Sequence, residues 1–291
     1  MRQTDGQIVE PGTLYLVGTP IGNLGDVTRR SEAVLGAVDV ILCEDTRVTG
    51  MLLQAINVDR PKEAFHQHNT MRRLPSIIRR LQEGQAMALV SDRGMPTVSD
   101  PGRELVEACH REGIPVSVIP GASALTVAFA GSGYSHPLLF WGFLPARGKE
   151  RREALQGVAE TVITQVFYEA PHRLRATITD FSEVLGEERE ITVARELTKP
   201  YEQFWQGTLA EANRQIAGFR GELVLLLAPT DKARIKTRID EPSPQLWLAL
   251  KALVEEALAH GEPVTDAVRR IASQFRVPRR DLYDLVKGHD D

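Results

Sequence analysis

The stretch LYLVGTPIGNLGD, residues 14–26, contains the unit from which this chain is built. Leu14–Val17 is an apolar run of strand length, and a loop rich in glycine separates it from a helical pattern. The stretch MALVSDRGMPTVSDPG, residues 87–102, repeats this order. In an open parallel sheet such loops lie at the carboxyl ends of the strands, where ligands bind. The two stretches therefore predict an α/β sheet with a small-ligand site at its edge.

Neither loop has the signature of a phosphate site. The first lacks the GxGxxG spacing, and neither contains the lysine of a P-loop. A third loop, PGASA at residues 120–124, consists of small residues that admit a ligand close to the main chain. We therefore expect a small ligand that is not a nucleotide held by its phosphates.

The order of apolar and helical patterns divides the chain into three parts. Residues 12–125 predict an N-terminal α/β lobe with a largely parallel sheet. Its strands are expected at Leu14–Val17, Val38–Leu42, Met87–Ser91 and Val116–Ile119. Residues 126–229 predict a second α/β lobe with a mixed sheet. Its strands are expected at Leu139–Phe143, Val162–Glu169, Glu190–Ala194 and Glu222–Ala228. A charged stretch bounded by Pro229 and Pro244 predicts a linker, and residues 245–291 predict a small helical extension.

Composition sets limits on the class of protein. The chain has 291 residues, of which 42% are hydrophobic and 25% charged, so it is globular and long enough for two domains and an appendage. Its net charge of −4 gives no global nucleic-acid signature, although a local basic face is enough to contact phosphates. Cys43 and Cys109 lack metal spacing and are expected to be buried free thiols. With a polar N-terminus and no run long enough to span a bilayer, we expect a cytoplasmic protein with no membrane partner.

Two histidines, His66 and His68, stand two residues apart in an extended segment. This spacing suggests a metal site, but no further cysteine or histidine follows at a matching distance. We therefore expect no metal.

Five blocks of sequence follow one another in a fixed order: TPIGNLGD at 19–26, CEDTR at 43–47, the loop 91–102, YEAPHR at 168–173 and ARELTK at 194–199. Together they resemble the tetrapyrrole methylase superfamily, and within it the methyltransferases of small-subunit ribosomal RNA, from about Gly12 to Pro229. The resemblance implies the two-lobed class III methyltransferase fold with a helical C-terminal extension. It implies a homodimer that holds S-adenosylmethionine between its lobes. It also implies 2′-O-methylation of a cytidine ribose in 16S rRNA, at the decoding centre of the small ribosomal subunit.

The loops then supply the residues expected to hold this cofactor: Pro20, Asp92, Gly94, Pro96, Thr97, Ala122, Ser123 and Ala124. S-adenosylmethionine has no phosphate, and its charged ends suit the carbonyls, N–H groups and carboxylates of such loops. Asp92 is interpreted as a cofactor contact rather than as a turn former that binds its own backbone. For Asp100 the same two interpretations stay open, because the following proline favours a turn.

Charged residues that follow strands of the second lobe are the candidates for catalysis and for holding RNA phosphate: Glu169, His172, Glu196 and Lys199, with Arg173 as a substrate contact. A ribose 2′-hydroxyl is a weak nucleophile, so a positioned base would help, while positioning alone supplies part of the rate. The alternative interpretation is that these residues cap helices and turns.

Further substrate contacts are expected in two other places. Glu44, Asp45 and Arg47 follow a strand and form either a substrate-facing cluster or an exposed ion pair of little energetic weight. The C-terminal extension carries two arginine pairs that are candidates for RNA contact, although nearby acids balance their charge: Arg269, Arg270, Arg279 and Arg280.

Arg93 and Met95 depart from the family, which usually has alanine and threonine there. A long cation at this position would clash with the cofactor, pair with a carboxylate or reach RNA. Two other functions remain open: methylation of a tetrapyrrole or another small molecule on the same fold, and RNA binding without catalysis.

Overall fold

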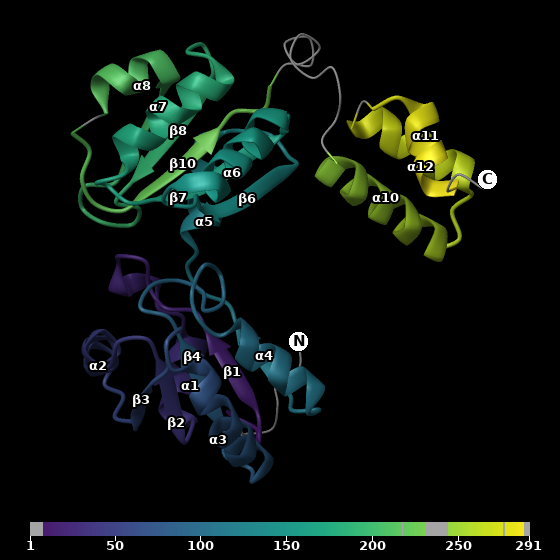
Figure 1. Ribbon diagram of the computed structural model, residues 1–291. Helices are drawn as coiled ribbons and strands as arrows, with labels where there is room; N and C mark the ends of the chain where they lie inside the picture. The colour runs from purple at the N-terminus through teal and green to yellow at the C-terminus, as the bar shows by residue number, and fades with distance from the viewer. Residues whose placement is uncertain (1–7, 217, 231–243, 276, 288–291) are drawn as a thin grey trace. The chain divides into compact units, whose positions relative to one another are not determined.

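The computed structural model describes residues 8–216, 218–230, 244–275 and 277–287 (Figure 1). Its internal contacts divide these residues into two compact units. The first consists of the described residues up to Leu155 together with Ile163–Pro229, and the second of Gln156–Val162 together with the described residues after Pro229. Residues 231–243 of the predicted linker lie outside the described ranges.

The first sheet is parallel and has the strand order β3-β2-β4-β1-β5. Its strands are β1 (Leu14–Val17), β2 (Val40–Cys43), β3 (Lys62–Ala64), β4 (Met87–Val90) and β5 (Val116–Ile119). Between them lie η1 (Leu24–Asp26), α1 (Arg29–Ala37), α2 (Thr46–Ala55), α3 (Thr70–Gln82) and α4 (Arg103–Arg111). The prediction of a parallel α/β sheet is confirmed. The edge strand β3 was not predicted, because Lys62-Glu63-Ala64 is short and mostly charged.

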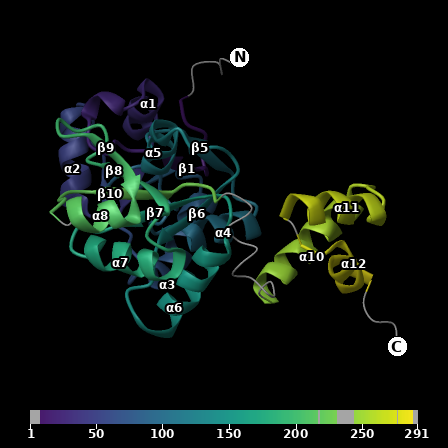
Figure 2. The ribbon, with the colours of Figure 1, turned by 90° about the horizontal axis from the view of Figure 1, so that it is seen from above.

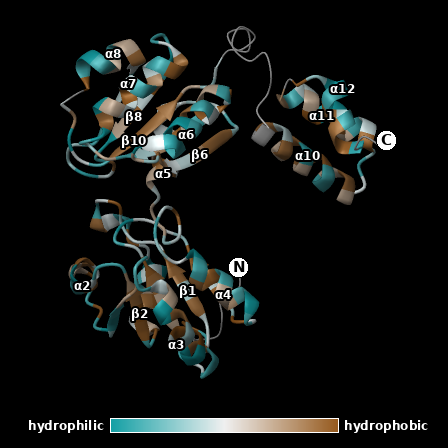
Figure 3. Ribbon diagram, in the orientation of Figure 1, coloured by the Kyte–Doolittle hydropathy of each residue, from teal (hydrophilic) through white to brown (hydrophobic). Residues whose placement is uncertain are grey.

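Helices cover both faces of this sheet, because successive side chains of a strand point to opposite faces. Leu14 and Leu16 pack with residues of α3 and α4 in one core. Tyr15 and Val17 pack with residues of α1 and α2 in the other. All four residues of β1, β2 and β4 are buried, and Figure 3 shows these strands as hydrophobic. A continuous apolar run in the sequence is thus the consequence of a sheet that is covered on both sides.

The second sheet has the order β6-β7-β10-β8-β9. Its strands are β6 (Leu138–Phe143), β7 (Thr164–Glu169), β8 (Glu190–Arg195), β9 (Gln203–Thr208) and β10 (Leu223–Leu227). Its helices are α5 (Ala124–Ser132), α6 (Gly148–Glu160), α7 (Leu174–Leu185) and α8 (Leu209–Gln215). Strands β6 and β7 are parallel and the other pairs antiparallel, which confirms the predicted mixed sheet. The edge strand β9 was missed, because its polar and aromatic residues lack an apolar run.

The two faces of the second sheet have different partners. Val166 and Val224 point to the face on which Ala128 of α5 packs. Phe167 points to the other face, where its ring lies 5.0 Å from that of Phe181 on α7. Ile21, from the loop after β1, joins the first of these cores, so that face lies toward the loops of the first sheet.

The C-terminal residues form three helices, α10 (Pro244–Ala259), α11 (Val264–Phe275) and α12 (Arg279–Lys287). Figures 1 and 2 both show these three helices side by side. Their shared core includes Leu250, Val268 and Leu282. The predicted helical extension is confirmed. No helix in the described ranges is long and apolar enough to cross a membrane.

Candidate active site

The three predicted loops meet at the carboxyl edge of the first sheet. Thr19 and Gly94 exchange backbone hydrogen bonds of 2.9 and 3.2 Å, and the Thr19 hydroxyl donates to the carbonyls of Ser91 and Gly94. Gly18 and Gly121 approach so closely that a Cβ on Gly121 would lie 2.8 Å from the Gly18 backbone. Glycine is required at this crossing because a side chain on either residue would push the loops apart.

Left-handed backbone conformations occur in two of the loops around this point. Thr97 and Ser99 have φ of 71° and 67° in the loop after β4, and Glu196 and Thr198 have φ of 50° and 65° in the loop after β8. A β-branched residue such as threonine rarely adopts a positive φ. Such strain persists only where the surrounding structure imposes it, and it concentrates at functional sites.

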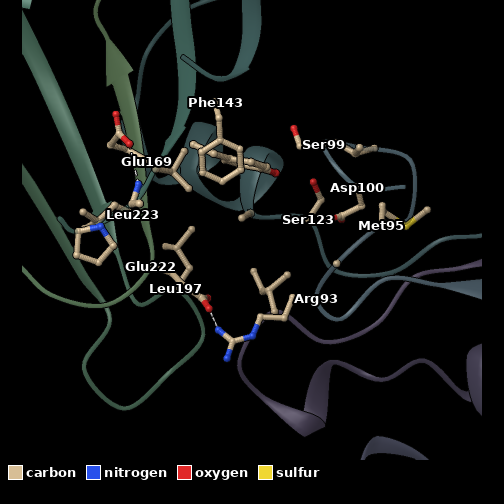
Figure 4. A pocket seen from close by; sticks show the side chains of 18 residues that line it. Arg93, Met95, Ser99, Asp100, Ser123, Phe143, Glu169, Leu197, Glu222 and Leu223 are labelled. Atoms are coloured by element: carbon tan, nitrogen blue, oxygen red, sulfur yellow. Dashed lines mark hydrogen bonds and ion pairs between the residues drawn. The ribbon is translucent and has the colours of Figure 1, made fainter. Parts of the chain in front are cut away.

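A cavity of about 350 Å³ lies between these loops and the second sheet (Figure 4). Its wall is mostly apolar, with Ile21 and Met95 on the side of the first sheet and Phe143 and Leu223 on the other. Its size falls in the range of small-molecule sites. The cavity therefore has the volume and lining of a site for a ligand with substantial apolar surface.

The predicted cofactor residues fall into two groups. Gly94, Ser123 and Ala124 line the cavity. The others are not part of its lining: Pro20, Asp92, Pro96, Thr97 and Ala122. They belong to the same three loops, and their direct contact with a cofactor stays a prediction.

Asp92 ties two neighbouring strand ends together. Its Oδ1 accepts a hydrogen bond of 3.2 Å from the backbone N–H of Asp45. Asp45 in turn caps α2, accepting from the Arg47 N–H at 2.8 Å, and pairs with the exposed Arg47 guanidinium. The bonds from Arg47 lower the pKa of Asp45 to about 2. Burial, followed by the charge of Asp92, raises the pKa of the neighbouring Glu44.

Glu169 lines the cavity, but its carboxylate is held by its own turn. It accepts hydrogen bonds from the Ala170 N–H at 2.8 Å and from the Thr177 hydroxyl at 2.5 Å, and lies 3.5 Å from Arg173. Arg173 also donates to the Leu144 carbonyl at 2.6 Å. Glu169 and Arg173 thus join β7, α7 and the loop after β6. His172, in the same turn, is exposed.

Glu196 and Lys199 belong to a chain of charges that links the two sides of the cavity. The Lys199 ammonium lies 2.8 Å from Glu196 and 3.1 Å from Glu222. Glu222 also pairs with Arg93, from the loop after β4, as the dashed line in Figure 4 shows. Of the three outcomes considered for Arg93, the structure has the contact with a carboxylate. Glu196 and Lys199 do not line the cavity.

Asp100 and Tyr168 bring polar groups to the cavity from its two sides. Burial, followed by the charge of Glu44, raises the pKa of Asp100 to about 6, although a hydrogen bond with Ser91 opposes the rise. Burial also raises the pKa of Tyr168, whose hydroxyl is hydrogen-bonded to the Leu125 backbone and the Ser123 side chain.

Several lining residues had not been singled out from the sequence. Phe143 ends β6, and Glu222 and Leu223 stand at the start of β10. Because β10 runs antiparallel to β7, its beginning lies beside the end of β7. The rule that ligands sit after strands therefore misses residues that precede an antiparallel strand.

Most of the predicted RNA-binding arginines of the helical extension already form ion pairs. Three of them form ion pairs within that unit: Arg269 with Asp266 at 2.9 Å, Arg270 with Glu262 at 2.6 Å and Arg280 with Asp284 at 3.9 Å. Arg279 is exposed and has no ion pair with any residue in the described ranges. Across those same ranges, no group of three or more histidine, cysteine, aspartate or glutamate side chains is arranged to hold a metal ion.

Comparison with known proteins identifies the family. The sequence profile of the tetrapyrrole (corrin/porphyrin) methylases matches residues 13–213. The chain belongs to the tetrapyrrole methylase family.

Three relatives that are similar along most of the chain have the same name. Ribosomal RNA small subunit methyltransferase I of Synechocystis sp. is 45% identical over 283 residues, which cover 94% of this chain and 97% of that protein. The protein of that name from Halalkalibacterium halodurans is 41% identical, covering 98% of both chains. The one from Bacillus subtilis is 40% identical, covering 94% of this chain and 93% of the relative.

Solved structures of other tetrapyrrole methylases share the fold. A cobalt precorrin-4 methyltransferase has a TM-score of 0.57 at 18% identity, covering 75% of this chain and 95% of that one. Uroporphyrin-III C-methyl transferase from Thermus thermophilus, complexed with S-adenyl homocysteine, has a TM-score of 0.55 at 18% identity, covering 77% and 99%. Both coverages leave out part of this chain, and at such identities the likeness concerns the fold alone.

Proposed function

We propose that this chain is an S-adenosylmethionine-dependent methyltransferase that methylates the 2′-hydroxyl of a cytidine ribose in 16S rRNA, at the decoding centre of the small ribosomal subunit. The observation that carries the proposal is 45% identity to a ribosomal RNA small subunit methyltransferase I over 94% of the chain. The cavity supports it, because it lies where the three predicted loops meet.

The residues of the cavity fit S-adenosylmethionine. Apolar side chains such as Leu197 and Leu223 suit its adenosine. A Cβ on Gly94 would lie 3.2 Å from the Ile21 side chain and would narrow the cavity, so glycine at this position leaves room for the ligand. Asp100 places a carboxylate in the wall, which suits a cationic cofactor. When bound, the cofactor supplies an electrophilic methyl group. The chain's own contribution is to orient it, exclude water and accept a proton.

The three parts of the chain then have separate roles. The lobes at 12–125 and 126–229 supply the two walls of the cofactor cavity. Residues 245–291 contact RNA, with Arg279 as the arginine most available for a phosphate, because the other three are paired within their own unit. A chain cut after Pro229 should therefore bind S-adenosylmethionine normally but bind 30S subunits more weakly and with a smaller dependence on salt. Equal affinity and equal salt dependence would make the extension structural.

A homodimer and a cytoplasmic location belong to the same proposal. Two edge strands carry exposed apolar side chains, Val118 on β5 at 52% and Leu139 on β6 at 37%. An edge strand has unpaired N–H and C=O groups that can pair with another chain, so these two edges are the candidates for contact with a second copy. Light scattering should give a dimer for the wild type and a larger monomer fraction for Val118→Lys, whereas a monomeric wild type would contradict the proposal.

The experiment that tests the proposed function measures transfer of a labelled methyl group to 30S subunits, naked 16S rRNA and a panel of tetrapyrroles. We expect transfer to rRNA, with the label on a cytidine 2′-oxygen after nucleotide mapping, and no added metal requirement. Transfer to a tetrapyrrole alone would assign the chain to small-molecule methylation. RNA binding without transfer would make it an adaptor.

A pair of glycine variants locates the cofactor in this assay. Gly121→Ala places a methyl group 2.8 Å from the Gly18 backbone, so the loops must separate and S-adenosylmethionine affinity should fall at least about tenfold. Gly36→Ala, in helix α1, meets nothing closer than Val58 at 3.7 Å and should bind the cofactor like the wild type. Equal binding by both variants would place the cofactor elsewhere.

A further inference from the structure

Phe143 is a large apolar side chain that lines the cavity and is nevertheless 53% exposed. It ends β6, beside the end of β7, and Figure 4 shows its ring on the wall of the cavity. The centroid of its ring lies 5.6 Å from that of Tyr168, and the two ring planes are inclined by 65°. This edge-to-face contact fixes the orientation of the ring. Phe143 therefore presents a fixed aromatic surface at the mouth of the cavity.

A β-bulge turns Phe143 toward the cavity. Trp141 lies on the face of the second sheet that α7 covers, where its ring stacks 6.1 Å from that of Phe167. In a regular strand residue 143 would point to the same face as residue 141. The pairing of β6 with β7 shifts by one residue at Gly142, whose φ is 67°, so Phe143 pairs with Tyr168 on the cavity face instead. Bulges re-aim side chains beside active sites, and this one places a phenylalanine where more than half of its surface stays exposed.

The segment that follows β6 is basic, although the whole chain has a net charge of −4. Residues 144–152 contain one acid and four cations: Arg147, Lys149, Arg151 and Arg152. Lys149 and Arg151 are paired with the carboxylates of Glu153 and Asp180. Arg147 and Arg152 are exposed and form no ion pair with any residue in the described ranges. Their charges are therefore available to a partner.

The start of α7 brings another arginine to the same edge. Arg175 stands in the first turn of α7, and it is exposed and without an ion pair among the described residues. Arg173 donates to the carbonyls of Leu144 and Pro145 at 2.6 and 3.3 Å, which joins the start of α7 to the loop after β6. Because β6 and β7 are parallel, both loops lie at the end of the second sheet where Phe143 stands. The exposed ring thus has unpaired arginines on the two loops beside it.

This combination fits RNA. The bases of single-stranded RNA stack on aromatic side chains, and arginines hold its phosphates. An acidic peptide would also be attracted by the arginines, but it has no planar base for the exposed ring. The cofactor fills the cavity from within, whereas the exposed part of Phe143 can be reached from outside by a large substrate.

We propose that Phe143 stacks on a nucleobase of the substrate RNA at the mouth of the cavity, and that Arg147, Arg152 and Arg175 hold phosphates on either side of it. The proposal rests on the proposed function and adds to it an RNA-binding surface on the second lobe, separate from the helical extension. Stacking fixes the nucleotide whose ribose receives the methyl group, and such positioning contributes directly to the rate of an in-line displacement.

The first test compares Phe143→Leu, which keeps an apolar side chain but removes the planar ring, with Phe143→Trp, which keeps a planar ring. Calorimetry measures S-adenosylmethionine binding, and methylation of 30S subunits gives kcat/KM. For Phe143→Leu we expect kcat/KM to fall about 20-fold, and for Phe143→Trp to stay within about threefold of wild type. Cofactor affinity should stay within about twofold in both. Met71→Leu, at a 74% exposed position in α3, should match the wild type in each measurement.

Two results would overturn the assignment of Phe143. Wild-type kcat/KM in Phe143→Leu would show that the ring is not needed. A loss of S-adenosylmethionine affinity in Phe143→Leu would mean that the ring stacks on the adenine of the cofactor instead.

The second test concerns the arginines. The double variant Arg147→Gln with Arg175→Gln is compared with Arg79→Gln with Arg111→Gln, which removes the same charge in the last turns of α3 and α4. Binding to 30S subunits is measured from 50 to 300 mM salt. The slope of log affinity against log salt should be smaller by about 1.5 in the first double variant and unchanged in the second. Equal slopes in the two double variants would overturn the proposal. If the wild type transfers no methyl group to rRNA, the proposed function fails and this proposal with it.

Discussion

The loop after β4 (residues 91–102) and the loop after β8 (residues 196–202) are alike in backbone and differ in how their charged side chains are paired. Each contains two non-glycine residues with positive φ. In the loop after β8, the side chains of Glu196 and Lys199 pair with each other, and Glu202 accepts the Thr198 N–H at 2.6 Å. In the loop after β4, Arg93 pairs with Glu222, but Asp100 faces the cavity without a cation.

This difference separates two kinds of charged residue that look the same in a sequence. A carboxylate whose hydrogen bonds and ion pairs are complete stabilises the loop that carries it. A carboxylate that is buried without a cation costs stability, and such a cost is typical of a functional group. The strained backbone marks both loops, whereas the missing partner marks only the loop after β4.

Glu169 should show the largest effect on stability. Glu169→Gln removes the charge that faces Arg173 and weakens two hydrogen bonds in a buried turn, so the free energy of unfolding should fall by about 3 kcal/mol in urea titrations. Glu153→Gln, which removes an exposed ion pair with Lys149, should change it by less than about 0.5 kcal/mol. If Glu169→Gln keeps full stability and loses its single-turnover rate, then the completed carboxylates of the second sheet also do chemistry and the comparison breaks.

Asp100 should affect stability in the opposite direction and with a pH dependence. Its pKa of about 6 in the folded protein lies above the usual 3.8, so the folded state binds more protons between those values and loses stability as pH rises through 6. Asp100→Asn should therefore be more stable than the wild type by about 2 kcal/mol at pH 8, with the two converging near pH 4. Equal stability of both proteins at pH 4 and pH 8 would show that the carboxylate carries no such cost.

At the end of the neighbouring strand β2, ionised Asp45 should stabilise the fold, which is the opposite of the effect expected for Asp100. Its pKa is lowered to about 2 by Arg47, so the stability that it contributes is present above pH 4 and is lost as pH falls toward 2. Urea titrations of Asp45→Asn and wild type between pH 2 and 7 should therefore differ most at the upper end.

The ion pair in the loop after β8 should have a smaller effect. Lys199→Met removes the partner of Glu196 and Glu222, and should lower the free energy of unfolding by about 1 kcal/mol. Because its charge is neutralised by Glu196 and Glu222, the single-turnover rate should stay within about threefold of wild type. A rate loss of 100-fold in Lys199→Met with normal stability would restore the sequence-based assignment of Lys199 to catalysis.

The pair between Arg93 and Glu222 should have the smallest effect. Both side chains are about half exposed, at 51%, so the charges are well screened. Arg93→Ala should change S-adenosylmethionine affinity by less than about fivefold, and this change should shrink as salt is raised from 50 to 500 mM. A large effect that salt does not alter would mean that Arg93 touches the cofactor directly.

Much of the fold could be predicted because its signals are local. The buried strands of the first sheet are covered on both faces, so each appears as an apolar run that period and composition detect. The edge strands β3 and β9 were missed because their residues are largely charged or polar and form no such run. The edge strands β5 and β6 have apolar runs and were predicted.

The site could be predicted only in part. Glycines and prolines indicated where the loops meet, since Gly18 and Gly121 are required by close backbone approach and Gly94 by its φ of 82°. Whether a charged side chain is paired could not be predicted from the sequence, because its partner belongs to another element of the fold. Glu169 accepts a hydrogen bond from Thr177 of α7, whereas Asp100 has no cation beside it among the described residues. Residues that line the cavity from the start of an antiparallel strand, such as Glu222, were missed because the sequence rule considers only residues that follow a strand.

The residues that line the cavity are synthesised at different times during translation. The lining begins with Ile21 in the first loop and is completed by Val224 in β10. During translation, most of the chain is therefore synthesised before the cofactor cavity can form. The first sheet can fold at that stage, while the cavity wall that it supplies is still exposed to water. Nascent chains that stop before β10 would have both a strained loop and an exposed Asp100 but no enclosed cavity. Methyl transfer thus requires that β10 has been synthesised and has joined the second sheet.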